Sequence, residues 1–119
     1  MNPDPIFSLD DALARVDHDT EIFQIMAEIF VEQGLKDLAD AQAALAAQDA
    51  PALARSAHRL KGAILQFSAP TVFEATKQLE ELGHAGNLES AVAVCATLEI
   101  ELLRLLAALR QLLEKGLPS

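Results

Sequence analysis

Apolar residues recur every three or four positions along most of this chain, which is the spacing of one face of an α-helix. The pattern divides into a short segment over about 10–16 and four long segments over about 20–48, 50–67, 70–83 and 88–115. It therefore predicts an all-α protein. Four long amphipathic helices joined by short loops are expected to pack as an antiparallel up-down-up-down four-helix bundle, with the short helix as an N-terminal addition.

Residues that favour the start or the end of a helix stand between these segments. Asp19, Asp49 and Asn87 are each a good N-cap for the helix that follows. Ser68-Ala69-Pro70 breaks the chain between the second and third long helices. We found no linker, internal repeat or low-complexity stretch, so the sequence predicts a single domain over 1–119.

Charge and composition restrict the classes of partner and the cellular location. The formal net charge of the 119 residues is -9 at pH 7, which argues against binding to nucleic acid or to an anionic membrane. No apolar run reaches the roughly 18 residues of a membrane span, and the N-terminus lacks a basic, apolar signal sequence. The single cysteine, Cys95, excludes an internal disulfide. We expect a cytoplasmic protein that is a monomer, since the bundle seams account for most apolar side chains.

One helical face carries an unusual combination of side chains. His58, Lys61 and Gly62 stand at i, i+3 and i+4 and so share that face. A glycine inside a helix costs roughly 1 kcal/mol relative to alanine, but its bare backbone lets another molecule approach the imidazole. The lysine suits an anion carried on the ring. The residues alone leave two interpretations, a site that holds a phosphoryl group and a half-buried structural histidine.

A longer motif runs through the same face: a histidine, any residue, a hydrophobic residue and then Lys-Gly, over 58–62. On this motif, and with helices of matching length and spacing from about Phe7 to Leu113, the chain resembles the histidine-containing phosphotransfer (HPt) domain family. Further positions that match the family are Ala57, Phe67, Ala69, Leu79 and Glu80. Two positions depart from it, because the family usually has a small polar residue at Ala63 and a glycine at Ser68.

The resemblance implies a phosphorelay carrier that exchanges a phosphoryl group with aspartates of response-regulator receiver domains and works with a sensor histidine kinase. His58 is then the phosphoacceptor, Lys61 neutralises phosphoryl charge and Gly62 gives the receiver room. Glu80 stands where the family often orients the histidine ring, with an ordinary surface carboxylate as the alternative. Arg55 is a candidate second cation or a solvated surface residue. Mg²⁺ is expected in the receiver, so the chain is expected to need no metal or cofactor and to be no enzyme by itself.

The first half of the helix predicted over about 20–48 is apolar on more than one face. One interpretation is that the short N-terminal helix covers the excess through Ile6, Leu9 and Leu13. The other is an apolar patch beside His58, matching the surface on which HPt proteins dock receivers. The residues expected in that docking patch are Ile22, Ile25, Met26, Ile29, Ala54 and Leu65. A mixture of the two interpretations is expected.

The remaining candidates for chemistry are few. His18 lies between aspartates in a loop and is expected to be solvated, and His84 stands near a helix C-terminus, where a protonated ring favours the helix dipole. No set of histidine, cysteine and acidic residues has metal-ligand spacing. Two alternative functions remain, a non-phosphorylated helical adaptor and an HPt domain excised from a hybrid sensor kinase. The initial methionine and the absence of a trailing linker favour a freestanding protein.

Overall fold

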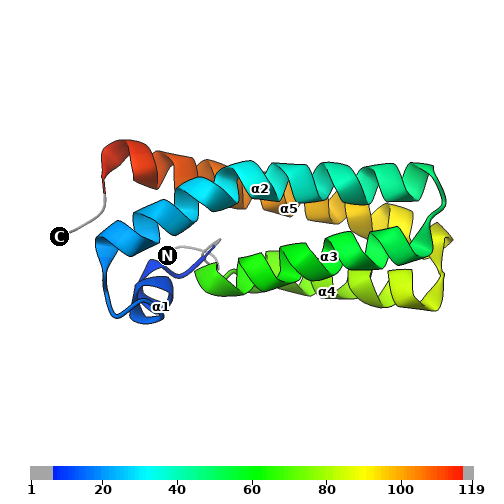
Figure 1. Ribbon diagram of the computed structural model, residues 1–119, viewed down its shortest axis with the longest axis horizontal. Coiled ribbons are helices and arrows are strands. Elements are labelled where there is room, and N and C mark those ends of the chain that lie inside the picture. The colour runs from blue at the N-terminus through cyan, green and yellow to red at the C-terminus, as the bar shows by residue number, and fades with distance from the viewer. Residues whose placement is uncertain (1–6, 117–119) are drawn as a thin grey trace, which may run out of the picture.

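The protein folds as an antiparallel bundle of four long helices with one short helix across one end, as Figure 1 shows for the computed structural model. The structure describes residues 7–116, so the expectation for Ile6 lies outside it. The elements in chain order are α1 (Leu9–Ala14), α2 (Thr20–Ala46), α3 (Ala50–Ile64), the 3₁₀ turn η1 (Leu65–Phe67), α4 (Pro70–Ala85) and α5 (Leu88–Lys115). Helices α2 to α5 alternate in direction, and α1 lies beside the start of α2 (Figure 1). The predicted all-α bundle is confirmed.

Three long helices begin with the N-cap side chains that the sequence predicted. A carboxylate or amide oxygen of Asp19, Asp49 and Asn87 accepts a hydrogen bond from the backbone N–H three residues further on, at 3.1 to 3.2 Å. Each bond satisfies one of the N–H groups that has no partner inside the helix. Local sequence therefore determines where α2, α3 and α5 begin.

The second long helix ends earlier than the sequence predicted. Helix α3 stops at Ile64, and the chain continues through η1 instead of remaining α-helical to residue 67. Ser68 has φ 51° and ψ 57°, a left-handed conformation that turns the chain so that Pro70 can begin α4. The first helix is also displaced, from the predicted 10–16 to 9–14. Ser8 N–H donates to the carbonyl of Ser68 at 3.1 Å, which ties α1 to this turn.

Helices α3 and α4 come especially close together at one point, and this contact positions the candidate site. A Cβ added to Gly83 on α4 would lie 2.9 Å from the backbone nitrogen of Ala54 on α3, so only a glycine fits there without a shift. Glu80 precedes Gly83 by about one helical turn, and His58 follows Ala54 by the same interval. The close approach therefore brings the Glu80 carboxylate within reach of α3.

An aliphatic core with a small aromatic centre holds the four helices together. The Phe67 ring lies 5.8 Å from the Phe23 ring in an edge-on arrangement and 4.9 Å from the Phe30 ring, measured between centroids. Cys95 is buried on the inner face of α5. Within residues 7–116, no helix combines the length and the apolar character that crossing a bilayer requires.

Candidate functional site

His58 presents its imidazole on the outer surface of α3, with 69% of the side chain exposed. Its Nδ1 lies 2.8 Å from Oε2 of Glu80 on α4. An ionised carboxylate can only accept a hydrogen bond, so Nδ1 carries the hydrogen in this contact. In the neutral ring, Nε2 then keeps its lone pair. The geometry provides an oriented imidazole with a nucleophilic nitrogen that partners can reach.

Glu80 is the centre of the site. Its side chain is only 11% exposed, and Lys61 Nζ lies 2.6 Å from its other oxygen, Oε1, which is buried and has no other partner among the described residues. The hydrogen bond from Lys61 lowers the pKa of Glu80, and the bond from His58 acts in the same direction, whereas burial opposes them. Glu80 is therefore a carboxylate at neutral pH that holds His58 and Lys61 together.

A second histidine binds the same carboxylate. His84 follows Glu80 by one turn of α4, and its Nε2 lies 3.4 Å from Glu80 Oε2 while 68% of its side chain is exposed. The position of His84 near a helix C-terminus had indicated only an interaction with the helix dipole, so this contact was not predicted. The i, i+4 spacing of Glu80 and His84 is the signal that indicates it. We call His58, Lys61, Glu80 and His84 the Glu80 cluster.

Gly62 and Arg55 occupy different surroundings on α3. A Cβ added to Gly62 would meet nothing within 4 Å, so this glycine is not required by the packing of the free protein. It lies one turn from His58 and leaves the helix surface bare there. Arg55 lines a separate hollow between α2 and α3 with Asp40 and Ser56, and it is not part of the Glu80 cluster. Hydrogen bonds and ion pairs thus connect Lys61 and Glu80 to His58, and among the described residues Arg55 makes no such contact with them.

Four of the six expected docking residues are exposed apolar side chains, and two are not. Ile22, Ile25, Ile29 and Leu65 are each between 46% and 61% exposed, so α1 does not cover them. Met26 is half-buried and packs against the core. The expectation that Ala54 belongs to this surface is wrong, because Ala54 is 4% exposed and lies against Gly83. We call Ile22, Ile25, Ile29 and Leu65 the apolar patch.

The register of α2 against α3 places the apolar patch along the bundle from His58. Arg59 contacts Asp37 and Asp40 of α2 at 3.5 and 3.2 Å, which sets residue 59 level with about residue 38. Because the helices are antiparallel, Leu65 is level with about residue 32 and lies roughly 10 Å along the axis from His58. The patch therefore begins about two turns from the imidazole rather than surrounding it.

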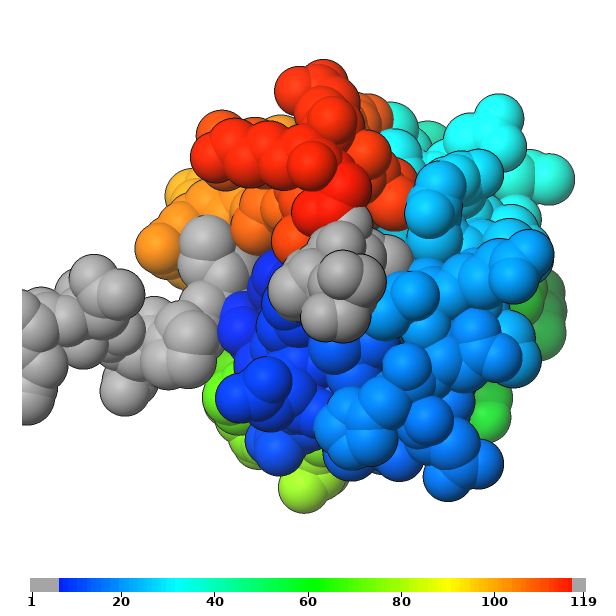
Figure 2. Space-filling view, turned by 90° about the vertical axis from the view of Figure 1, so that its left-hand side faces the viewer, coloured from blue at the N-terminus to red at the C-terminus, as the bar shows by residue number. Residues whose placement is uncertain are grey.

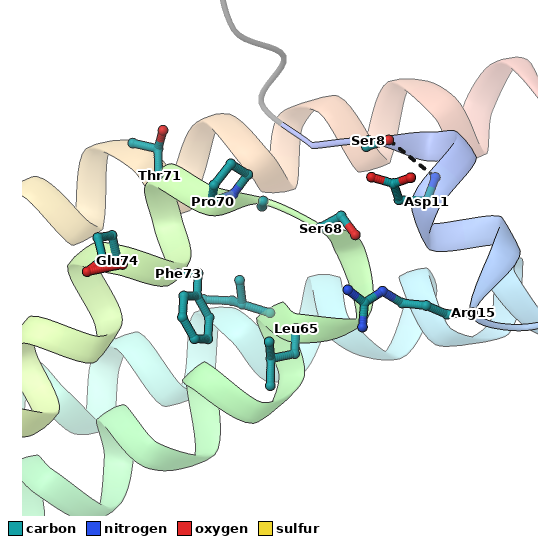
Figure 3. A pocket seen from close by; sticks show the side chains of 11 residues that line it. Ser8, Asp11, Arg15, Leu65, Ser68, Pro70, Thr71, Phe73 and Glu74 are labelled. Carbon is teal, nitrogen blue, oxygen red and sulfur yellow. Dashed lines mark hydrogen bonds between the residues drawn. The ribbon is translucent and has the colours of Figure 1, made fainter.

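A broad hollow lined in part by Leu65 lies at the end of α3 and does not include His58. It measures about 970 Å³ and opens between α1, η1 and the start of α4. Figure 3 shows Leu65 and Phe73 on one side of it and Asp11 and Arg15 on the other. Figure 2 shows this end of the molecule, where α1 meets the first turns of α2. His58 itself lies on an open helix surface, which suits contact with a macromolecule better than enclosure of a small ligand.

The donors of the Glu80 cluster do not form a metal centre. Within residues 7–116, no group of three or more histidine, cysteine, aspartate and glutamate side chains has the arrangement needed to hold a metal ion. The cluster instead contains a carboxylate shared among nitrogen donors. Its chemistry is hydrogen bonding to two exposed imidazoles, those of His58 and His84, and charge compensation around them.

Comparisons with known proteins identify this arrangement of helices. The family model described as "Hpt domain" matches residues 25–114, which contain all of α3, α4 and most of α2 and α5. The crystal structure of histidine-containing phosphotransfer protein B (HptB) from Pseudomonas aeruginosa PAO1 has the same fold, with a TM-score of 0.88 and 24% sequence identity. That alignment covers 97% of this chain and 100% of the HptB chain. No curated protein matches the sequence. The family match spans well over half of the chain, so the protein belongs to the Hpt domain family.

Proposed function

We propose that this protein carries a phosphoryl group on Nε2 of His58 and exchanges it with aspartates of receiver domains in a phosphorelay. Membership of the Hpt domain family supports histidine phosphotransfer as the general role. The observation that carries the assignment to His58 is the 2.8 Å contact from its Nδ1 to Glu80, in a ring that is 69% exposed. This contact leaves Nε2 as the nitrogen that can attack phosphorus.

The transfer needs only positioning and charge compensation from this chain. The Nε2 lone pair attacks the phosphorus of an aspartyl phosphate, the P–N bond forms, and the P–O bond to the aspartate breaks to release its carboxylate. The proton on Nδ1 stays between His58 and Glu80, whose negative charge offsets the positive charge that develops on the ring. The receiver contributes Mg²⁺ and its own acidic pocket. The same steps in reverse return the phosphoryl group to an aspartate.

Lys61 has two possible anionic partners in this cycle. It pairs with Glu80 Oε1 at 2.6 Å in the free protein, and about two negative charges arrive one helical turn away when His58 is phosphorylated. Lys61 then neutralises part of the phosphoryl charge. Arg55 lies outside the Glu80 cluster, so we assign its charge to the approach of the partner rather than to the phosphoryl group.

The partner is proposed to dock over α3 and the apolar patch. Gly62 leaves clearance next to His58, and Leu65 on η1 and Ile25 and Ile29 on α2 are exposed apolar side chains that a partner could cover. A sensor kinase would supply phosphoryl groups to the relay through a receiver. The protein is proposed to act as a monomer, because a stable dimer that buries α2 would cover the patch.

The function is tested by the variant His58→Gln. The glutamine keeps a polar side chain of similar size at an exposed position, so the bundle should melt as the wild type does while uptake of acid-labile phosphate disappears. Phosphoryl donors should include a phosphorylated receiver and phosphoramidate, a small molecule that needs no docking. His18→Gln is the matched control, because His18 is exposed in a loop and should be dispensable. A His58→Gln protein that still takes up acid-labile phosphate contradicts the proposal, and a wild type that takes up none supports a non-phosphorylated adaptor.

A further inference from the structure

Two histidines converge on one oxygen of Glu80. His58 Nδ1 lies 2.8 Å and His84 Nε2 lies 3.4 Å from the same Oε2. The two ring nitrogens are therefore no farther apart than these two distances combined. Glu80 is ionised and accepts only, so His84 must also carry a hydrogen on Nε2 for its contact to be favourable. One oxygen thus accepts from both rings while Lys61 occupies the other oxygen.

The two histidines differ in what they are available to do. His58 belongs to the surface that faces a docking partner, next to the bare backbone of Gly62. His84 is as exposed as His58, at 68%, but stands one turn beyond Glu80 near the end of α4. A histidine changes charge between about pH 5 and 8. A proton on His84 therefore places a second cation, beside Lys61, next to the carboxylate that holds His58.

We propose that His84 is a positioning residue of the phosphotransfer site, which acts through Glu80 and stabilises the phosphorylated form of His58 when its own ring is protonated. This inference rests on the phosphotransfer function proposed above. A protonated His84 balances part of the Glu80 charge, so that Lys61 can turn from Oε1 to the phosphoryl group. The added positive charge also disfavours protonation of phosphohistidine, which precedes cleavage of its P–N bond by water.

The other charged groups on the elements around His84 are the same in every protein compared. They include Lys77 and Glu81 on α4, Arg55 on α3 and Glu89 in the first turn of α5. His58, Lys61 and Glu80 are likewise unchanged in all of them. A difference between the wild type and a variant of His84 therefore isolates the charge of His84.

The test compares three residues at position 84. The protein is phosphorylated with phosphoramidate, which transfers its phosphoryl group to Nε2 with loss of ammonia, and the decay of phosphohistidine is followed by ³¹P NMR between pH 6 and 8.5. His84→Gln cannot carry a charge and His84→Arg always does. At pH 6 the wild type and His84→Arg should lose the group about threefold more slowly than His84→Gln, the effect of one exposed charge pair. At pH 8.5 the wild type should match His84→Gln, while His84→Arg remains slower.

The controls separate this role from a structural one and from the function itself. His18→Gln removes an exposed histidine outside the Glu80 cluster and should decay as the wild type does at every pH. All variants should melt at similar temperatures. A loss of stability alone would not make the ratio of the decay rates of the wild type and His84→Gln change with pH. Equal decay of the three proteins at pH 6 overturns the role of His84 but leaves the phosphotransfer function standing. A wild type that takes up no phosphate at His58 overturns the function and this inference with it.

Discussion

Substitutions of Gly62 distinguish an effect on partner docking from an effect on the chemistry of transfer. A Cβ built at this position meets nothing within 4 Å, so Gly62→Ala introduces no clash in the free protein and the side chain of Gly62→Gln starts in open space. Each replaces the residue of lowest helix propensity apart from proline, which should stabilise α3 by about 0.5–1 kcal/mol. For a domain of this size the gain corresponds to a rise in melting temperature of roughly 2–5 °C.

The docked receiver should experience the opposite effect. A glutamine at position 62 projects into the space next to His58 that the receiver must occupy. Overpacking of a close contact costs about 1–3 kcal/mol, which corresponds to a roughly 5- to 150-fold loss of transfer rate from a phosphorylated receiver. Alanine adds only one carbon and should cost less. Phosphoramidate needs no docking surface, so both variants should take up phosphate from it at about the wild-type rate.

The assay combines thermal melting with transfer rates from the two donors. Ala96→Gln is a matched control, since Ala96 is exposed on α5 and lies away from α3, and both its rates should equal those of the wild type. A Gly62→Gln protein that receives phosphate from the receiver at an unchanged rate would refute the clearance argument. Equal losses from both donors would show instead that the substitution damages the Glu80 cluster.

Three further predictions concern the same structure. Lys61→Ala should slow transfer about five- to a hundredfold without stopping it. It should also lower the free energy of unfolding by about 1–3 kcal/mol, because buried Oε1 of Glu80 loses its only described partner. Transfer rates and melting curves measure the two effects, and unchanged values would contradict the ion pair. Ser68→Gly should raise the free energy of unfolding by about 0.5–1 kcal/mol, because φ is 51° at this position and glycine adopts such a backbone without strain. The control Ser56→Gly, inside α3, should lower it. A less stable Ser68→Gly protein would contradict the argument that the backbone is strained at Ser68. The lowered pKa of Glu80 stabilises the fold at pH values above its ordinary pKa of 4.5, and this stabilisation is lost as the pH falls through the pKa of the folded state. Between pH 7 and pH 3 the free energy of unfolding, measured by denaturation, should therefore fall more steeply for the wild type than for Glu80→Gln. The same pH dependence in both proteins would contradict this prediction.

Short-range patterns in the sequence were sufficient to predict the helices and their order. The apolar spacing of 3.6 residues and the N-caps Asp19, Asp49 and Asn87 act within one or two turns, so each helix can be recognised without knowledge of its neighbours. The end of α3 could not be placed in this way. It depends on the left-handed backbone of Ser68, a conformation that serine rarely adopts and that the turn into α4 imposes.

The same distinction applies to the residues of the candidate site. His58, Lys61 and Gly62 share one helical face because of their spacing alone, so the sequence was enough to group them. The resemblance to a known family indicated Glu80, which is 22 residues away from His58. The i, i+4 spacing of Glu80 and His84 is visible in the sequence, but neither source indicated that Lys61 binds the same carboxylate or that Ala54 is covered. The contact of Lys61 with Glu80 and the burial of Ala54 exist because Gly83 lets α3 and α4 approach closely, and a distance between two helices is set by tertiary packing rather than by the pattern along either helix.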